Sequence, residues 1–181
     1  MTDLTKYAID KLLQHEGKYS NDQSDRGGET YCGITRKNFP DLKLWELLAQ
    51  GQPEEVLMLH VYRFYEEWWH SIGAELISDN KLSVEYFIAS VNCDKSRAVK
   101  MMQRSLNYLN RNQKDYPDVS IDGVFGNKTF EAVSALKKKR GLGVLRKMFN
   151  VMLGIHYTNI WDNDISQRGY VGWADRLWCE G

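Results

Sequence analysis

Hydrophobic residues recur at three- and four-residue spacing over most of the chain, which predicts a mainly α-helical protein. Near the N-terminus this pattern runs through Leu4, Ile9 and Leu13 as far as Glu16, and Gly17 is a natural helix stop. The same spacing predicts later helices at about 45–48, 53–73, 81–92, 95–110, 128–140 and 142–161, with a short tail helix at about 171–178.

Helix-end signals and turn residues refine this pattern. Pro53 suits the first position of its helix, and Asn127 is expected as the N-cap of the helix that ends before Gly141. Residues 17–35 are rich in Gly, Asn, Asp and Ser, which is typical of turns. We expect a short hairpin through Thr30–Thr35 inside this segment.

Composition narrows the function classes. The chain has 181 residues with 24 Lys and Arg against 24 Asp and Glu, so it lacks the net positive charge of a dedicated nucleic-acid binder. The three cysteines, Cys32, Cys93 and Cys179, are widely scattered and form no C-x-x-C pair. A disulfide framework and a zinc site are therefore not expected, and no metal or organic cofactor is implied.

The sequence also carries expectations about location. No apolar run approaches the roughly 20 residues of a membrane span, so we expect no membrane insertion. Residues 1–5 form neither a basic leader nor a long apolar stretch, so no signal peptide is recognised and synthesis in the cytoplasm is expected. Action outside the cell would then need a release route that the sequence does not display.

Glu16 is the first candidate for chemistry. It lies seven residues after Ile9 and three after Leu13, so it continues the apolar stripe of the first predicted helix and falls in its last turn. Partial burial and the negative end of the helix dipole would both disfavour the charged carboxylate. A carboxyl group that keeps its proton near neutral pH is what a general acid needs to protonate a departing oxygen.

Asp25 is the second candidate, in a loop dense with glycine and polar residues. In that wetter setting we expect the carboxylate to stay ionised, and glycoside hydrolysis uses two carboxyl groups in unlike surroundings. Gly27 and Gly28 would let the backbone approach a ligand, and Thr30 could hold a water or orient a carboxylate. The residues alone leave open the plainer alternative of a solvated glutamate followed by an ordinary turn.

Segments 15–22, 25–30 and 33–35, with the sequences HEGKYSND, DRGGET and GIT, resemble the signature of glycoside hydrolase family 108. These proteins are N-acetylmuramidases, or phage-type lysozymes, also called secretion activator proteins. Lys18 departs from the signature, which has glycine at that position. The resemblance implies that Glu16 is the catalytic acid with Asp25 and Thr30 as companions, and it implies a substrate-binding role for Tyr19, Asn21, Asp22 and Asn92.

The resemblance extends over nearly the whole chain. Residues 65–69 and 91–92 are similar to family segments, although Cys93-Asp94 replaces a residue followed by glycine and no acidic residue stands at 88–90. From about residue 98 the chain resembles the family's C-terminal peptidoglycan-binding region, in segments 103–107, 122–129, 172–173 and at Arg176. We expect a lysozyme-like catalytic region over 1–95 and a helical peptidoglycan-binding-like region over 96–181, packed together in a single compact body.

Two other patterns have competing interpretations. The turn at 122–129 resembles neither a phosphate loop nor a complete calcium loop, and a structural role is favoured over direct ligand contact. The run Lys137–Arg140 is either a solvated face that suits a helix C-terminus or a surface that attracts an anionic wall polymer or nucleic acid. The solvated face is the simpler interpretation.

The patterns predict a mainly α-helical protein, and the resemblance implies that it is a lysozyme-like muramidase that hydrolyses the bond between N-acetylmuramic acid and N-acetylglucosamine. Its partner would be the peptidoglycan glycan strand, and a monomer that acts on the cell wall in the periplasm after release is expected. By analogy, a prophage endolysin released through a holin would fit. Two alternatives remain: a lytic transglycosylase that cleaves the same bond, and a non-catalytic wall-binding or secretion-accessory protein.

Overall fold

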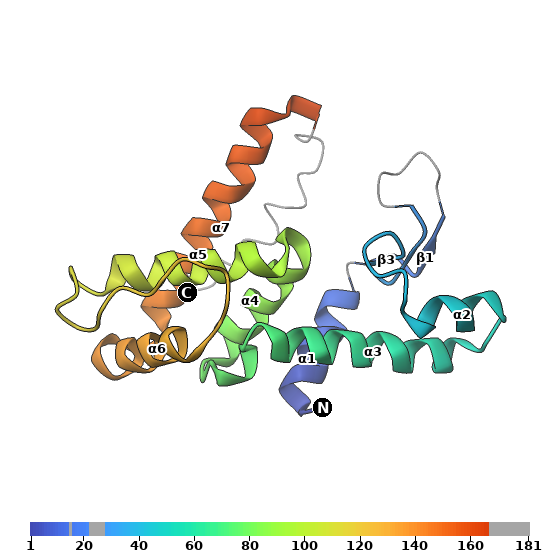
Figure 1. Cartoon of the computed structure of the whole chain (residues 1–181), viewed down its shortest axis with the longest axis horizontal. Coiled ribbons are helices and arrows are strands. Elements are labelled where there is room, and N and C mark those ends of the chain that lie inside the picture. The colour runs from blue at the N-terminus through green and yellow to red at the C-terminus, as the bar shows by residue number, and fades with distance from the viewer. Residues whose placement is uncertain (15, 22–27, 167–181) are drawn as a thin grey trace. The chain divides into compact units, whose positions relative to one another are not determined.

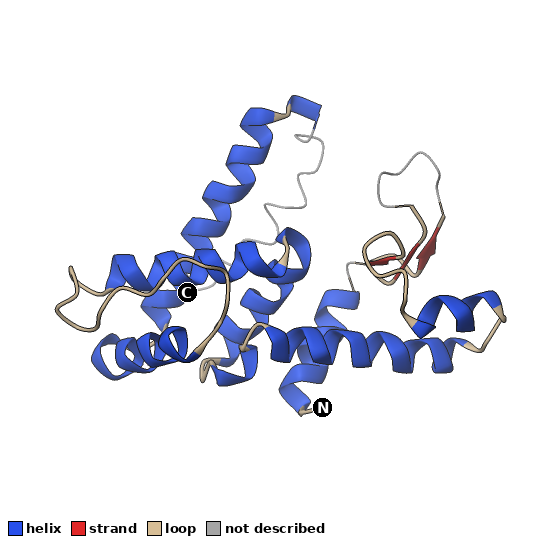
Figure 2. Ribbon diagram, in the orientation of Figure 1, coloured by secondary structure: helices blue, strands red, loops and turns tan. Residues whose placement is uncertain are grey.

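The computed structural model describes residues 1–14, 16–21 and 28–166. It divides into two compact units, Met1–His70 and Ser71–Gly181. Helices dominate both, and a small antiparallel sheet lies in the first unit (Figures 1 and 2). The prediction of a mainly α-helical, lysozyme-like fold is therefore confirmed. Among the described residues, no helix is both long and apolar enough to cross a bilayer.

The first unit begins with helix α1 (Asp3–Leu13), whose buried face includes Ala8, Ile9 and Leu12. The expectation that this helix extends to Glu16 is wrong, because Gln14 already caps it. The chain leaves the helix early since Lys18 must pair with the sheet: the Lys18 carbonyl accepts a hydrogen bond from the Cys32 backbone N–H at 2.6 Å. Glu16 thus lies in the connection between helix and sheet.

Three two-residue strands form the sheet in the order β1 (Tyr19–Ser20), β2 (Thr30–Tyr31) and β3 (Ile34–Thr35). Both pairings are antiparallel. The expected hairpin through Thr30–Thr35 is therefore present. Its two turn residues, Cys32 and Gly33, have φ angles of 50° and 78°, the positive values that a tight two-residue hairpin requires.

Helices α2 (Lys43–Ala49) and α3 (Glu54–Ser71) complete this unit, the last residue of α3 belonging to the second. Pro53 directly precedes α3, where its missing N–H costs nothing. The buried side chains of α3 recur every four residues, so one face of the helix enters the core: Leu57, Val61, Tyr65 and Trp69.

The second unit holds a short 3-10 helix η1 (Ala74–Leu76) and helices α4 (Asn80–Cys93), α5 (Lys95–Leu109), α6 (Asn127–Arg140) and α7 (Gly143–Asn163). Helix α5 packs against α4, α6 and α7. One cap differs from expectation: Asn127 is the first helical residue and Gly126 is the N-cap, without a side-chain hydrogen bond. The predicted tail helix, with residues 172–173 and Arg176, lies outside the described residues.

Asp94 joins α4 to α5 in a backbone conformation that normally requires glycine. Its φ and ψ angles are 73° and 154°, a region almost restricted to glycine. The Asp94 carboxylate compensates by accepting a hydrogen bond from the backbone N–H of Arg97 at 3.0 Å, which caps α5. This explains how aspartate is accommodated where the family pattern has glycine.

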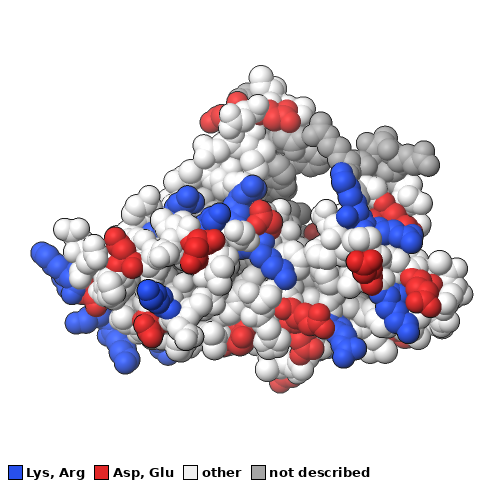
Figure 3. Space-filling view, in the orientation of Figure 1, with Lys and Arg blue, Asp and Glu red and all other residues white. Residues whose placement is uncertain are grey.

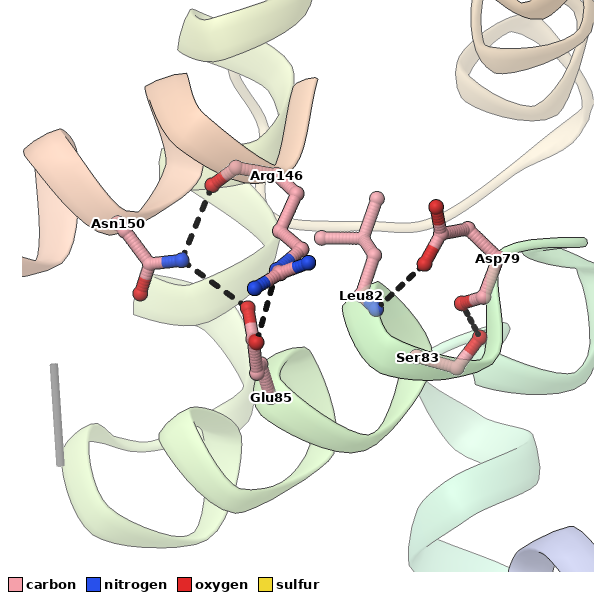
Figure 4. A network of polar contacts seen from close by, with 6 residues as sticks. All are labelled: Asp79, Leu82, Ser83, Glu85, Arg146 and Asn150. Carbon is pink, nitrogen blue, oxygen red and sulfur yellow. Dashed lines mark hydrogen bonds and ion pairs between the residues drawn. The ribbon is translucent and has the colours of Figure 1, made fainter. Parts of the chain in front are cut away.

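Glu85 ties α4 to α7 through a buried polar network (Figure 4). Its carboxylate accepts hydrogen bonds from Arg146 Nε at 2.9 Å and from Asn150 Nδ2 at 3.0 Å. Burial nevertheless raises the pKa of Glu85 above its ordinary value, because these partners only partly offset the loss of hydration.

Candidate active site

The Glu16 carboxyl group lies against the hairpin turn between β2 and β3. A Cβ atom built on Gly33 would stand 3.0 Å from Glu16 Oε2 and 2.9 Å from the Tyr65 hydroxyl oxygen. Two side chains from different elements therefore converge on one glycine. Only a residue without a side chain leaves room for both, and glycine also adopts the positive φ of this turn at little cost.

Tyr65 anchors the turn from the core side. Its ring is buried in α3, and its hydroxyl donates a hydrogen bond to the Cys32 carbonyl at 2.8 Å. Burial raises the pKa of Tyr65 well above its usual value, and the negative charge of Glu16 acts in the same direction. The hydroxyl therefore stays protonated and holds the hairpin turn in place through its hydrogen bond to the Cys32 carbonyl.

The Glu16 carboxyl itself is half-buried, and no hydrogen bond or ion pair joins it to another residue in the described part of the chain. Lys18, two residues along the chain, forms an ion pair with Glu54 instead: its ammonium lies 2.7 Å from Glu54 Oε1. This hydrogen bond raises the pKa of Lys18. The lysine that replaces the signature glycine is thus held by α3, and the Glu16 carboxyl is available to a ligand.

Cys32 lies beside these groups but is unsuited to nucleophilic chemistry. Burial raises the pKa of its thiol to about 11, and the negative charges of Glu54 and Glu16 contribute to the increase. Its sulfur contacts the Met58 sulfur at 3.9 Å. The thiol therefore stays protonated at physiological pH and serves the packing of the turn.

The other predicted site residues of the first unit lie on or next to the sheet. The Tyr19 side chain is 52% exposed on β1, and its hydroxyl donates to Glu29 Oε1 at 3.3 Å. Asn21 is exposed just after β1, and the Thr30 hydroxyl donates to the Gly28 carbonyl at 3.1 Å. An aromatic face and an amide are therefore open to solvent close to the sheet.

The structure does not place the remaining three predicted site residues, Asp22, Asp25 and Asn92, beside Glu16. Asp22 and Asp25 lie outside the described residues. Asn92 is half-buried near the end of α4 in the second unit. The second carboxyl group and these binding residues stay predictions.

Sequence reasoning missed the roles of Tyr65 and Glu54. Tyr65 follows the apolar spacing of α3. This spacing predicts a core residue, but it does not indicate that the Tyr65 hydroxyl reaches the hairpin turn. Glu54 is 36 residues from Lys18 along the chain. No local pattern reports such a pair.

The motif at 122–129 in the second unit forms a structural turn around the buried amide of Gln103. This amide donates to Asp122 Oδ1 at 2.8 Å and to the Val124 carbonyl at 3.1 Å, and it accepts from the Gly123 N–H at 3.0 Å. A small open cavity of about 290 Å³ lies beside the start of α6 and is lined by Gln103, Val119, Ser120, Asp122, Val124, Gly126, Asn127, Lys128 and Thr129. Across the described residues, no group of three or more His, Cys, Asp or Glu could hold a metal ion.

Comparisons with known proteins agree with this architecture. Residues 9–93 match the family model described as Glycosyl hydrolase 108, and residues 97–178 match the one described as Predicted Peptidoglycan domain. No functionally curated protein matches the chain. Among solved structures, that of Brucella abortus SagA aligns with a TM-score of 0.61 over 96% of this chain and 88% of that chain, at 21% identity, which shows a shared fold.

The two family matches follow one another with a gap of only a few residues and together span almost the entire chain. The first includes Glu16, Gly33 and Tyr65, and the second includes the turn built around Gln103. The chain is therefore built of a glycosyl hydrolase 108 domain over residues 9–93, followed by a predicted peptidoglycan domain over residues 97–178.

Proposed function

We propose that the protein is a muramidase that hydrolyses the glycosidic bond between N-acetylmuramic acid and N-acetylglucosamine in peptidoglycan, with Glu16 as the general acid. One observation carries this proposal. The Glu16 carboxyl is half-buried against a rigid turn, and no ion pair or hydrogen bond to a described residue occupies it. A general acid must reach the glycosidic oxygen within hydrogen-bond distance, and a carboxyl group already bound to a lysine could not do so.

The surroundings of Glu16 support this role. Gly33 and Tyr65 border the carboxyl on the protein side. The Tyr65 hydroxyl donates its hydrogen bond to the Cys32 carbonyl. The acid can therefore move little toward the core and receives no competing donor from this hydroxyl. Restricting a reacting group in this way lowers the entropic cost of reaching the productive geometry.

Asp25, with Thr30, is the proposed companion of Glu16. An ionised carboxylate would either stabilise the oxocarbenium-like transition state or orient the attacking water. A separation of the two carboxyl groups near about 5 Å would give retention at the anomeric carbon, and about 6.5–9.5 Å would give inversion.

The proposed substrate contacts use the exposed groups near the sheet. The Tyr19 ring would stack on a sugar face, and Asn21, Asp22 and Asn92 would hydrogen-bond the glycan. A cell-wall substrate further implies that the protein acts beyond the cytoplasmic membrane after release.

Digestion of purified sacculi tests this function. The wild-type protein should lyse them and yield reducing N-acetylmuramic acid ends by mass spectrometry, whereas Glu16→Gln should lyse them at least about 100-fold more slowly with an unchanged melting temperature. Glu46→Gln, which changes an exposed carboxyl group of α2, is the matched control and should retain full activity.

Each other result has a definite meaning. Formation of 1,6-anhydromuramic acid would identify a lytic transglycosylase. Lysis by Glu16→Gln at the wild-type rate would refute the assignment of the acid. No lysis by the wild-type protein, together with binding to the sacculi, would identify a wall-binding or secretion-accessory protein.

A further inference from the structure

One end of the second unit carries a concentration of positive charge, here called the basic end. It consists of six exposed side chains from the last turn of α6 and the loop that follows α5: Arg111, Lys114, Lys137, Lys138, Lys139 and Arg140. Figure 3 shows Lys and Arg side chains over the part of the second unit where this loop and α6 lie. Because the whole chain is neutral, this surface is a local asymmetry of charge.

The two segments of the basic end form one electrostatic surface. Asp115, in the loop, has a lowered pKa first because Arg111 hydrogen-bonds it, and Lys139 and Arg140 of α6 lower it further. Arg111 Nε and Nη2 lie 2.8 and 2.6 Å from the two Asp115 oxygens. The Asp115 side chain is only 2% exposed beneath this contact, so it offers solvent little negative surface.

The cations of α6, at residues 137–140, form no ion pairs within the described part of the chain, although Lys139 and Arg140 act on Asp115 at longer range. A helix C-terminus favours cations, but the dipole there amounts to about half a negative charge. Four adjacent cations exceed that charge and repel one another, so an external anion would stabilise this surface.

The loop of the basic end is held in an unusual conformation. Arg111, Asn112 and Gln113 have φ angles of 54°, 58° and 63°, three consecutive left-handed residues without a glycine. The buried side chain of Asn110 holds this turn, since its Oδ1 accepts from the Gln113 N–H at 3.0 Å and its Nδ2 donates to Asp118 Oδ1 at 2.6 Å. Strained turns of this kind occur preferentially where ligands are bound.

We propose that the basic end binds the carboxylates of peptidoglycan stem peptides and so anchors the enzyme to its insoluble substrate. This inference rests on the proposed function, because it takes peptidoglycan as the substrate. The sacculus presents carboxylates repeatedly along its strands, and a surface with several cations binds such a polyanion by releasing counterions. Because its net charge is zero, the whole enzyme is not attracted electrostatically to the anionic wall. The basic end supplies a local positive surface that is attracted to the wall.

The test is co-sedimentation of the full-length Glu16→Gln protein with purified sacculi that carry no phosphodiester polymer, so that the wall stays intact. We compare this parent with the same protein carrying Lys137→Gln and Lys138→Gln. Its matched control carries Lys43→Gln and Lys81→Gln, which remove two exposed positive charges outside the basic end. The basic-end variant should bind about tenfold more weakly than the parent at 50 mM salt, and the control should bind as the parent does.

A second arm changes the ligand and leaves the protein untouched. Amidation of the sacculus carboxylates should weaken binding of the parent about tenfold, and raising the salt from 50 to 200 mM should weaken it on untreated sacculi by a similar factor. Equal binding by the basic-end variant and its control would overturn the proposal. Unchanged binding to amidated sacculi, or binding only to walls that carry phosphodiester polymers, would overturn it as well.

These outcomes are separate from those that test the catalytic role. Failure of the wild-type protein to lyse sacculi would refute the proposed function while leaving the binding measurement interpretable. Conversely, lysis that depends on Glu16, combined with binding that does not depend on Lys137 and Lys138, would refute only the role of the basic end.

Discussion

Gly33 lacks a side chain in the space that the Glu16 carboxyl group occupies: a Cβ atom at position 33 would meet Glu16 Oε2 at 3.0 Å. The same imaginary atom would meet the Tyr65 hydroxyl at 2.9 Å. The hairpin turn, the candidate acid and the core of α3 are therefore coupled through one backbone position.

Gly33→Ala should impair both stability and lysis. The substitution would impose a left-handed backbone on alanine, at a cost of about 1–3 kcal/mol, and would push the Glu16 carboxyl from its position. Urea unfolding and turbidity assays on sacculi measure the two effects.

Gly51→Ala is the control for this change, because Gly51 also has a positive φ of 66° but no atom within 4 Å of its imaginary Cβ. It should lose stability without losing activity. Full lytic activity of Gly33→Ala would show that the position of the Glu16 carboxyl does not depend on the turn.

Releasing Lys18 from Glu54 should inhibit the enzyme. In Glu54→Gln the ammonium loses the charged partner that lies 2.7 Å away and keeps at most a hydrogen bond to a neutral amide oxygen, so it can pair instead with the Glu16 carboxyl, where it would compete with the glycosidic oxygen. We expect a several-fold loss of lytic rate and an unchanged melting temperature, because the pair is exposed.

The double variant Lys18→Ala with Glu54→Gln tests this cause. The double variant should regain the wild-type lytic rate, since it has no lysine that could pair with the Glu16 carboxyl. Lys18→Ala alone should also stay active. A double variant as slow as Glu54→Gln would mean that Glu54 acts in some way other than by holding Lys18.

At the junction of α4 and α5, Asp94→Ala should destabilise the protein more than Asp94→Gly. Both substitutions remove the cap to the Arg97 N–H, but only glycine relieves the backbone at φ 73° and ψ 154°. We expect a loss of about 1 kcal/mol for alanine and little or no loss for glycine, which is itself a tolerated N-cap. Urea unfolding of the two variants decides this, and equal stability would contradict the assigned strain.

Glu85 should make stability fall as pH rises. Its pKa is raised in the folded state by burial, so above the ordinary value near 4.5 the unfolded chain releases this proton more readily than the folded one. The contribution of Glu85 is therefore most favourable at low pH and is lost as pH rises through the raised pKa.

Comparison with Glu85→Gln isolates this effect, because glutamine can still accept the hydrogen bond from Asn150 but does not titrate. The free energy of unfolding of the wild type, relative to this variant, should fall between pH 4 and pH 7 (about the range that spans the ordinary carboxyl pKa). A rise over that range would mean that the charge of Arg146 outweighs burial.

Much of the helical architecture could be predicted from spacing alone. The predicted helices at 81–92, 95–110 and 142–161 differ from α4, α5 and α7 by at most two residues at either end. Each has a wide apolar face, and such a pattern is compatible with few other structures. The Thr30–Thr35 hairpin was also predictable, because the turn residues between its strands are local signals.

The errors occur where distant contacts compete with local preference. The apolar stripe of α1 continues to Glu16 in the sequence, yet the helix ends at Leu13 because residues 18–20 pair with β2 and the turn after it. At the start of α6 the backbone begins the helix one residue before the expected position, at Asn127. Helix ends are set by small energies that tertiary contacts easily exceed.

The sequence by itself determined the helical class, the family resemblance and the choice of Glu16 as the candidate acid, because apolar spacing and a dense motif are local properties of the chain. Only the tertiary structure decided that Glu16 has no partner among the described residues, that Glu54 holds Lys18, and that the Tyr65 hydroxyl anchors the turn at Cys32. These facts depend on contacts between segments more than 30 residues apart. Such contacts arise when the core of each unit packs, and spacing along the chain does not encode them.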